Sequence, residues 1–268
     1  MVLATEFPMI RKDDRQSGNT LDMAHLPALG GKAWPALHFL WAAMLLTGGL
    51  LLMPRLFAFT DLYITYSLSA FIVLVAAIGF GLYRFRDRSA LKSGGFGAAN
   101  AITMGRGVLI CLVAGAIGQA WSASAAWTFV AVSSFALIMD GFDGWYARRN
   151  GDDSPFGALF DQETDAAFIL ILAILVVDQG KAGPWIVLSG LLRYLFVFTG
   201  LFVDRLRAPL GPSIRRKTVC VIQVVSLVVC LAPIIPPGLS LWIAALSLAL
   251  LFYSFAVDVI SLMKRQHA

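Results

Sequence analysis

Long apolar runs are the feature that most constrains this chain. Eight runs, each near the ~20 residues that a membrane-spanning helix needs, fall at residues 34–54, 62–83, 101–120, 125–146, 158–178, 184–203, 218–235 and 239–262. Only 14% of the residues are charged, whereas a soluble domain averages about 25%. The sequence therefore predicts an all-α fold, a polytopic membrane bundle of about eight transmembrane helices.

Basic residues are concentrated in every second connection between these runs. They precede the first run, follow the second, fourth and sixth, and end the chain after the eighth. Basic loops stay on the cytoplasmic side of a membrane, so we expect both termini in the cytoplasm and a multi-pass protein of an inner or plasma membrane. This placement accounts for most of the net charge of +5 without nucleic acid as a partner, and it brings basic side chains to anionic membrane lipids.

Composition divides the chain into three parts. Residues 1–33 are polar and charged and are predicted to form a cytoplasmic N-terminal tail. Residues 34–83 contain two apolar runs with few polar side chains, which predicts an accessory transmembrane hairpin. Residues 84–268 contain six runs with short connections and are predicted to form one compact six-helix core.

Four aspartates interrupt the apolar pattern in the middle of the chain. Asp140 and Asp143 end the fourth run, and Asp161 and Asp165 begin the fifth. Residues three or four apart share a helix face, and the connection is short, so we expect adjacent, antiparallel helices whose four carboxylates line one cavity. Carboxylates are costly at membrane depth and mark a functional site there. Their oxygen atoms suit hard divalent cations such as Mg²⁺ or Mn²⁺.

The aspartates belong to a longer pattern that includes Gly144, Ala147, Arg148 and Gly157. The whole pattern reads Asp-x2-Asp-Gly-x2-Ala-Arg-x8-Gly-x3-Asp-x3-Asp. It resembles the signature of the CDP-alcohol phosphotransferase (phosphatidyltransferase) family, and the six-run unit resembles the membrane core of that family. The resemblance implies a metal-dependent transferase of phospholipid biosynthesis that moves a phosphatidyl group from CDP-diacylglycerol to the hydroxyl of a small alcohol and releases CMP. It also suggests a homodimer.

The resemblance assigns roles to particular residues. It implies metal ligands at Asp140, Asp143, Asp161 and Asp165, and it gives Asp165 a second role as the general base for the attacking hydroxyl. It implies a nucleotide-binding set made of Asn100, Thr103, Asp140, Gly144, Ala147, Arg148 and Gly157. Small residues let the backbone approach a ligand or another helix closely, and an arginine presents a planar fork of donors to phosphate.

A second segment fits the same resemblance. Asn100, Thr103 and Arg106 begin the third run at spacings that place them on one helix face. The sequence Asn-x-x-Thr-x-x-Arg resembles the entry to the first core helix of the family, where the first two residues lie near the cytidine nucleotide. Arg106 is deep enough in the run to need an anionic partner, either the aspartates or the phosphate of the donor.

Four basic residues are candidates for binding the acceptor, namely Arg193, Arg215, Arg216 and Lys217. Arg193 lies in the middle of the sixth run, where it must pair with an aspartate or with a ligand phosphate. Lys217 and Gln223 partly match a pair found in family members that use phosphorylated acceptors. They predict an anionic acceptor, such as glycerol 3-phosphate or an inositol phosphate, whereas the alternative is a set of charges that only fixes topology.

Two other functions remain open at this stage. The donor motif fits equally well a choline or ethanolamine phosphotransferase, which uses a CDP-amino alcohol as donor and diacylglycerol as acceptor. A cation transporter could use the same aspartates as part of a conduction path. Against transport, the aspartates gather near one side of the membrane, and polar groups are scarce on the other side.

Overall fold

The computed structural model describes residues 34–84, 98–150, 155–203 and 213–264. Within these ranges the chain forms eight α-helices and one short 3₁₀-helix, with no strand. The helices are α1 (Trp34–Phe57), α2 (Asp61–Arg84), α3 (Ala98–Ala114), α4 (Ala123–Asn150), α5 (Pro155–Asp178), η1 (Pro184–Val187), α6 (Leu188–Phe202), α7 (Ile214–Leu231) and α8 (Pro237–Lys264). The predicted all-α bundle is confirmed, with one helix for each of the eight apolar runs.

The bundle has the surface of a membrane protein. Large apolar side chains are exposed along most of its helices, while Arg106 and Gln223 are almost completely buried. Four of the described helices, α1, α2, α4 and α8, are long and apolar enough to cross a membrane. Of the others, α3 and α6 are apolar but shorter, and α5 and α7 carry several charged residues near their first turns.

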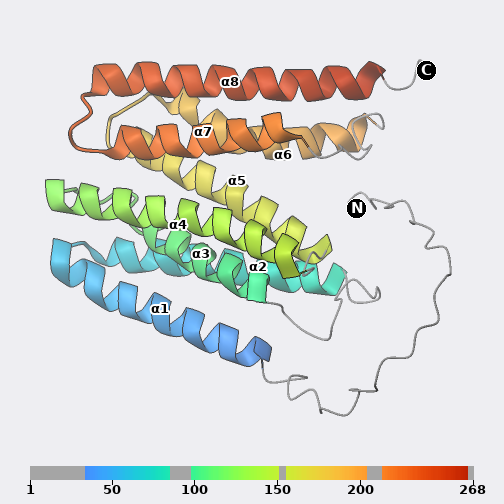
Figure 1. The fold of residues 1–268 in the computed structure, drawn as a ribbon. Helices are drawn as coiled ribbons and strands as arrows, with labels where there is room; N and C mark the ends of the chain where they lie inside the picture. Colours follow the sequence, from blue (N-terminus) through green and yellow to red (C-terminus); the bar gives the residue numbers. More distant parts are fainter. Residues whose placement is uncertain (1–33, 85–97, 151–154, 204–212, 265–268) are drawn as a thin grey trace, which may run out of the picture.

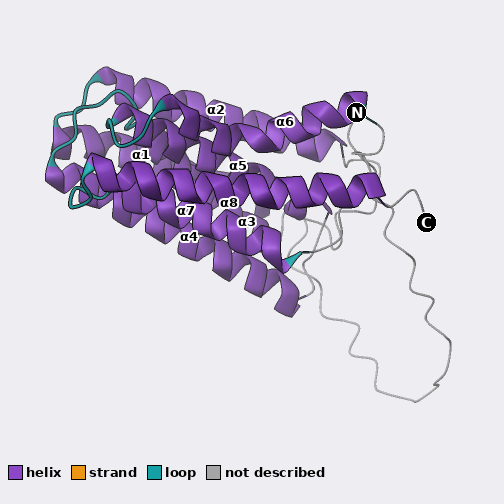
Figure 2. Ribbon diagram, turned by 90° about the horizontal axis from the view of Figure 1, so that it is seen from above, coloured by secondary structure: helices purple, strands orange, loops and turns teal. Residues whose placement is uncertain are grey.

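Two central helices organise the packing. Helix α3 contacts α1, α2, α4 and α5, and α5 contacts α2, α3, α6 and α7. Figure 1 shows α1 at one edge of the bundle and α8 at the opposite edge, with α8 packed on α7. The connections α1–α2, α3–α4, α5–η1 and α7–α8 gather at one end of the bundle (Figure 2). Helix α4 therefore ends, and α5 and α7 begin, at the other end.

Two glycines determine where α5 ends and how closely it packs against α6. Gly180 has a φ of +65°, and it ends α5 with backbone hydrogen bonds from Gly180 to Val177 and from Lys181 to Val176, the pattern of a helix terminated by a left-handed residue. At Gly190 of α6, an added Cβ would lie 2.4 Å from the Leu170 Cα of α5. Only glycine permits this approach, which brings the two helices together one turn before Arg193.

The α1–α2 hairpin supports the start of α5. Phe156 and Phe160 of α5 stack with ring centroids 5.9 Å apart, and both belong to a buried cluster formed mainly by α1, α2 and α3. Gly81 of α2 lies against the Phe156 ring. The hairpin is thus packed against the turns of α5 that lead into Asp161.

The expected pairing of α4 with α5 holds only at one end. The two helices run in opposite directions and approach each other where α4 ends and α5 begins, but they diverge toward the other end of the bundle (Figure 1). Along its length α4 packs mainly on α3 and α7. The prediction of adjacent helices was therefore wrong for most of their length, because α4 and α5 each pack on α3 and α7 rather than on each other.

Candidate active site

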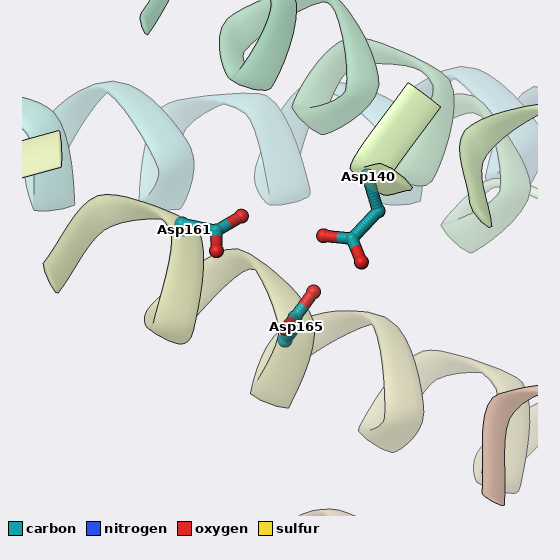
Figure 3. Close-up of side chains that lie close together, drawn as sticks. All are labelled: Asp140, Asp161 and Asp165. Carbon is teal, nitrogen blue, oxygen red and sulfur yellow. The ribbon is translucent and has the colours of Figure 1, made fainter. Parts of the chain in front are cut away.

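Three of the predicted metal ligands meet at one end of the bundle. Asp140 lies in α4, and Asp161 and Asp165 lie near the start of α5. Each offers a carboxylate oxygen, and these oxygens all lie within 4.8 Å of one another. Figure 3 shows the three side chains pointing into a common space between the two helices. We call Asp140, Asp161 and Asp165 the aspartate cluster.

Arg106 of α3 reaches into the aspartate cluster. Its side chain is only 1% exposed, and its guanidinium forms ion pairs with Asp140, with Asp161 at 2.7 Å and with Asp165 at 3.2 Å. A guanidinium removed from water needs anionic partners, because the desolvation of an unpaired charge is costly. Among these four residues, three carboxylates face one guanidinium, so two formal negative charges are left over.

The aspartate cluster fits a hard divalent cation. Its ligand atoms are all carboxylate oxygens, which Mg²⁺ and Mn²⁺ prefer. The three side chains are 26%, 42% and 33% exposed, so a cation can reach them from solvent. Arg106 already places positive charge against these carboxylates, so a metal ion held here would share them with the guanidinium.

The other residues of the motif are described less completely. Asp143, Gly144, Ala147 and Arg148 lie in the last turns of α4, and their side chains are outside the described residues. Gly157 lies in the first turn of α5 and is half-buried. A contribution of these residues to the site therefore stays a prediction.

The nucleotide-binding candidates Asn100 and Thr103 are buried on α3, the helix that carries Arg106. Asn100 is 8% exposed and Thr103 is 4% exposed. They precede Arg106 by two turns and one turn of the same helix, so the three side chains share a face. Because the guanidinium of Arg106 lies among the aspartates, this face of α3 points toward the site.

Arg193 has a different partner from the one predicted. Its guanidinium donates a hydrogen bond to Glu163 at 2.5 Å, whereas the sequence suggested an aspartate or a ligand phosphate. Glu163 lies on α5 between Asp161 and Asp165, but two residues from each, so it points to another face of the helix. The pair therefore links α5 to α6 beside the aspartate cluster.

Arg215 and Arg216 of α7 meet a single carboxylate, that of Asp258 in α8. Arg215 lies 2.5 Å and Arg216 lies 3.4 Å from the same Asp258 oxygen. We call the two residues the arginine pair. Lys217, next in the chain, is exposed. Helix α7 packs on α4 and α5 on one side and on α8 on the other, so it lies between the helices of the aspartate cluster and α8.

Sequence reasoning missed Glu163 and Asp258. Glu163 lies between Asp161 and Asp165, but it is not one of the specified positions of the family signature. Asp258 is the only acidic residue of α8, and an isolated carboxylate in an apolar run was itself a sign that a basic partner exists. The sequence offers no direct sign that this partner is on α7, because the contact depends on how the helices pack.

The protein is a polytopic membrane bundle with a cluster of carboxylates at one end. Comparison with known proteins shows the family to which it belongs. The sequence model of the CDP-alcohol phosphatidyltransferase family matches residues 96–253, which is more than half of the chain. The chain belongs to this family of transferases. Helices α1 and α2 lie outside the match.

Two curated relatives are both named CDP-diacylglycerol–glycerol-3-phosphate 3-phosphatidyltransferase. The protein from Cereibacter sphaeroides is 32% identical over 85 residues, which cover 32% of this chain and 37% of the relative. The protein from Pseudomonas fluorescens is 31% identical over 132 residues, which cover 44% of this chain and 64% of the relative. The chain thus matches less than two thirds of either relative. No solved structure gave a significant match.

Proposed function

We propose that the protein transfers a phosphatidyl group from CDP-diacylglycerol to the hydroxyl of a small anionic alcohol and releases CMP. The observation that carries the proposal is the convergence of Asp140, Asp161 and Asp165 around Arg106 in a chain of this family. Glycerol 3-phosphate is the first acceptor to consider, because both relatives carry it in their names. The reaction belongs to phospholipid biosynthesis.

The transfer exchanges one phosphorus–oxygen bond for another. The hydroxyl oxygen of the acceptor bonds to the phosphorus that carries diacylglycerol. The bond from this phosphorus to the bridging oxygen breaks, and CMP leaves with that oxygen. Asp165 accepts the hydroxyl proton on a carboxylate oxygen, as a general base. This role suits a half-buried carboxylate that belongs to the aspartate cluster and is accessible from solvent.

Asp140, Asp143, Asp161 and Asp165 are the residues proposed to hold two divalent ions, Mg²⁺ or Mn²⁺. When bound, such ions neutralise the pyrophosphate and stabilise the leaving oxygen. Arg106 provides fixed positive charge at the same place. It holds the three carboxylates of the cluster together and reduces their mutual repulsion.

The two substrates have separate sets of candidate residues. Residues proposed to bind the cytidine diphosphate part are Asn100, Thr103, Asp140, Gly144, Ala147, Arg148 and Gly157. Residues proposed to bind the acceptor are Arg193, Arg215, Arg216 and Lys217. Three of the acceptor residues begin α7, which packs on α4 and α5, the helices that carry the aspartate cluster. An acceptor phosphate bound there would place its alcohol on the side of the aspartate cluster.

The same proposal assigns places to the rest of the chain. The active site and both termini face the cytoplasm of a cell whose inner or plasma membrane holds the bundle, in line with the distribution of basic loops. Residues 84–268 form the catalytic core, residues 34–83 an accessory hairpin that supports α5, and residues 1–33 a cytoplasmic tail. Membrane lipids surround the bundle, and we keep the homodimer as part of the proposal.

Two other functions make different predictions. A choline or ethanolamine phosphotransferase would use the same aspartates with a CDP-amino alcohol donor and a diacylglycerol acceptor, but it would not need a cluster of basic residues for the acceptor. A cation transporter needs ligands along a path through the membrane. Within the described residues, the acidic side chains that could hold an ion form one group, at one end of the bundle, which favours an enzyme.

An acceptor screen tests the proposal. The full-length protein is reconstituted in liposomes with labelled CDP-diacylglycerol and Mg²⁺ or Mn²⁺, and CMP release is measured with glycerol 3-phosphate, inositol, inositol phosphate, serine, choline or phosphatidylglycerol. We expect release with an anionic alcohol, and none after Asp140→Asn. The proposal would be overturned if none of these alcohols supported CMP release from CDP-diacylglycerol while diacylglycerol supported CMP release from CDP-choline.

A further inference from the structure

A buried carboxylate interrupts the last helix of the bundle. Asp258 is the only acidic residue of α8 and lies six positions before the helix ends at Lys264. The residue is 7% exposed. A carboxylate with so little access to water is destabilising unless hydrogen-bond donors and positive charge surround it. Its neighbours on α7 therefore decide whether it can remain ionised there.

Arg215 is fixed by two acceptors on α8. It donates one hydrogen bond to the Asp258 carboxylate at 2.5 Å and one to the Ser254 carbonyl oxygen at 2.5 Å. The two acceptors lie one helical turn apart, so they define the plane of the guanidinium as well as its position. Arg216 approaches the same Asp258 oxygen at 3.4 Å. The carboxylate thus brings two neighbouring arginines to one point.

The charge of this group suits a phosphate. Two guanidinium groups share the one Asp258 carboxylate, and Lys217 places a further, exposed positive charge in the same turn of α7. A phosphate monoester carries about −1.5 to −2 near neutral pH. Helix α7 packs on α4 and α5, which carry the aspartate cluster, as well as on α8, so a phosphate bound at the start of α7 lies at the same end of the bundle as the proposed reaction centre.

Asp258 lies outside the stretch that the family shares. The family match ends at residue 253, whereas the arginine pair lies inside it. Family membership alone does not assign Asp258 a role.

We propose that Asp258 is a positioning residue that holds Arg215, with Arg216 beside it, to receive the phosphate group of an anionic acceptor. This inference rests on the proposed function. Asp258 does not contact the acceptor. It keeps two like charges close together, where they would otherwise repel each other, and it selects one orientation of the Arg215 fork. Without it the arginines keep their charge but lose their arrangement.

The kinetic test uses Asp258→Asn, which keeps the size of the side chain and removes its charge. Losing a charge-assisted hydrogen bond to Arg215 should raise the KM for glycerol 3-phosphate by about tenfold, while kcat and the KM for CDP-diacylglycerol change by less than about twofold. Asp258→Glu should recover most of the affinity, because it restores the charge. Ser261→Ala is the matched control: Ser261 bonds only the backbone carbonyl of Asp258, so the acceptor KM should not change.

A binding measurement separates this inference from the proposed function. Calorimetry on the full-length protein without donor measures binding of glycerol 3-phosphate and inorganic phosphate, with glycerol as the uncharged comparison. We expect Asp258→Asn to weaken both anions by about tenfold, with no binding of glycerol to either protein. If the wild type releases no CMP with any acceptor but still shows this loss of anion binding, the inference stands and the proposed function fails.

Three results would overturn the inference. The first is wild-type affinity for glycerol 3-phosphate in a folded Asp258→Asn variant. The second is a parallel change in kcat and in both KM values, which indicates a general structural effect. The third is a failure of Asp258→Glu to recover acceptor affinity. If Asp258→Asn does not fold, Arg215→Lys carries the test, because a lysine keeps the charge but cannot form both bonds of the planar fork. Unchanged acceptor affinity in that variant also contradicts the role.

Discussion

Two charged clusters near the same end of the bundle are built in opposite ways. In the aspartate cluster, three carboxylates share one guanidinium, that of Arg106. In the arginine pair, two guanidinium groups share one carboxylate, that of Asp258. The first cluster is built mainly of carboxylates and suits a cation, and the second is built mainly of guanidinium groups and suits an anion. A transferase that joins a metal-bound donor to an anionic acceptor needs both.

A third charged pair shows what a balanced arrangement looks like. Glu163 and Arg193 face each other one to one, between α5 and α6. Within this pair no charge is left over, so its contribution to ligand binding should be smaller than that of either cluster. We therefore expect substitutions in the two clusters to affect ligand binding more than substitutions in the Glu163–Arg193 pair. The predictions below test this order.

The largest effect is expected at the proposed general base. Asp165→Asn should lower kcat by roughly 10²–10⁴-fold, because the amide cannot accept the proton of the attacking hydroxyl. CMP release under saturating substrates measures it. Asp178→Asn is the control on the same helix, since Asp178 accepts a hydrogen bond from the Gly118 amide at the other end of the bundle. Turnover that survives in Asp165→Asn while the nucleotide still binds would falsify the role of Asp165.

Substitutions of Arg106 test whether the aspartate cluster depends on a positive charge. Arg106→Gln should lower the free energy of unfolding without metal by about 1–3 kcal/mol, because it removes the guanidinium that three mutually repelling, half-exposed carboxylates share. Added Mg²⁺ or Mn²⁺ should then raise the melting temperature more than it does in the wild type, since bound cations replace the lost charge. Arg106→Lys, which keeps the charge, is the comparison. An equal metal-induced shift in all three proteins contradicts the account.

The balanced pair should matter less than the arginine pair. Arg193→Gln is expected to raise the KM for glycerol 3-phosphate about threefold, against tenfold or more for Arg215→Gln, because Glu163 already satisfies much of its charge. Initial rates of CMP release at varied acceptor concentration give both values. A larger effect at Arg193 than at Arg215 would reverse the ranking and move the acceptor phosphate toward α6.

The smallest effect is expected at the other end of the bundle. Lys181 donates hydrogen bonds to the carbonyl oxygens of Ala232 and Ile235, at 3.4 Å and 2.5 Å, where α7 ends. Lys181→Met should cost about 1 kcal/mol of stability and leave both KM values unchanged. Thermal unfolding and the same kinetic assay check it. A change in acceptor KM would mean that the two ends of the bundle are coupled.

The sequence predicted the helices and the aspartate cluster well because both depend on local patterns. Apolar run length gave eight helices, and the i, i+4 spacing of Asp161 and Asp165 placed both in the cluster. The depth of Arg106 in its run also indicated an anionic partner, which the aspartates provide.

Contacts between helices that are distant in the sequence were harder to predict. The partner of Arg193 proved to be Glu163 rather than an aspartate, and Asp258 was not connected with Arg215. The packing of α4 and α5 on α3 and α7 rather than on each other was not expected either. Each depends on which helices pack side by side and on their rotation, and a single sequence records neither directly.

The most direct test of the central claim compares binding of a cation and an anion in one variant. Mn²⁺ and glycerol 3-phosphate binding are measured separately by calorimetry for the wild type and for Asp140→Asn. The account predicts that the variant loses at least about tenfold in Mn²⁺ affinity, because a carboxylate ligand is lost, and that its affinity for glycerol 3-phosphate does not fall. A wild type that binds no Mn²⁺, or a variant that loses both ligands equally, would contradict the division of the site into a cation-binding and an anion-binding cluster.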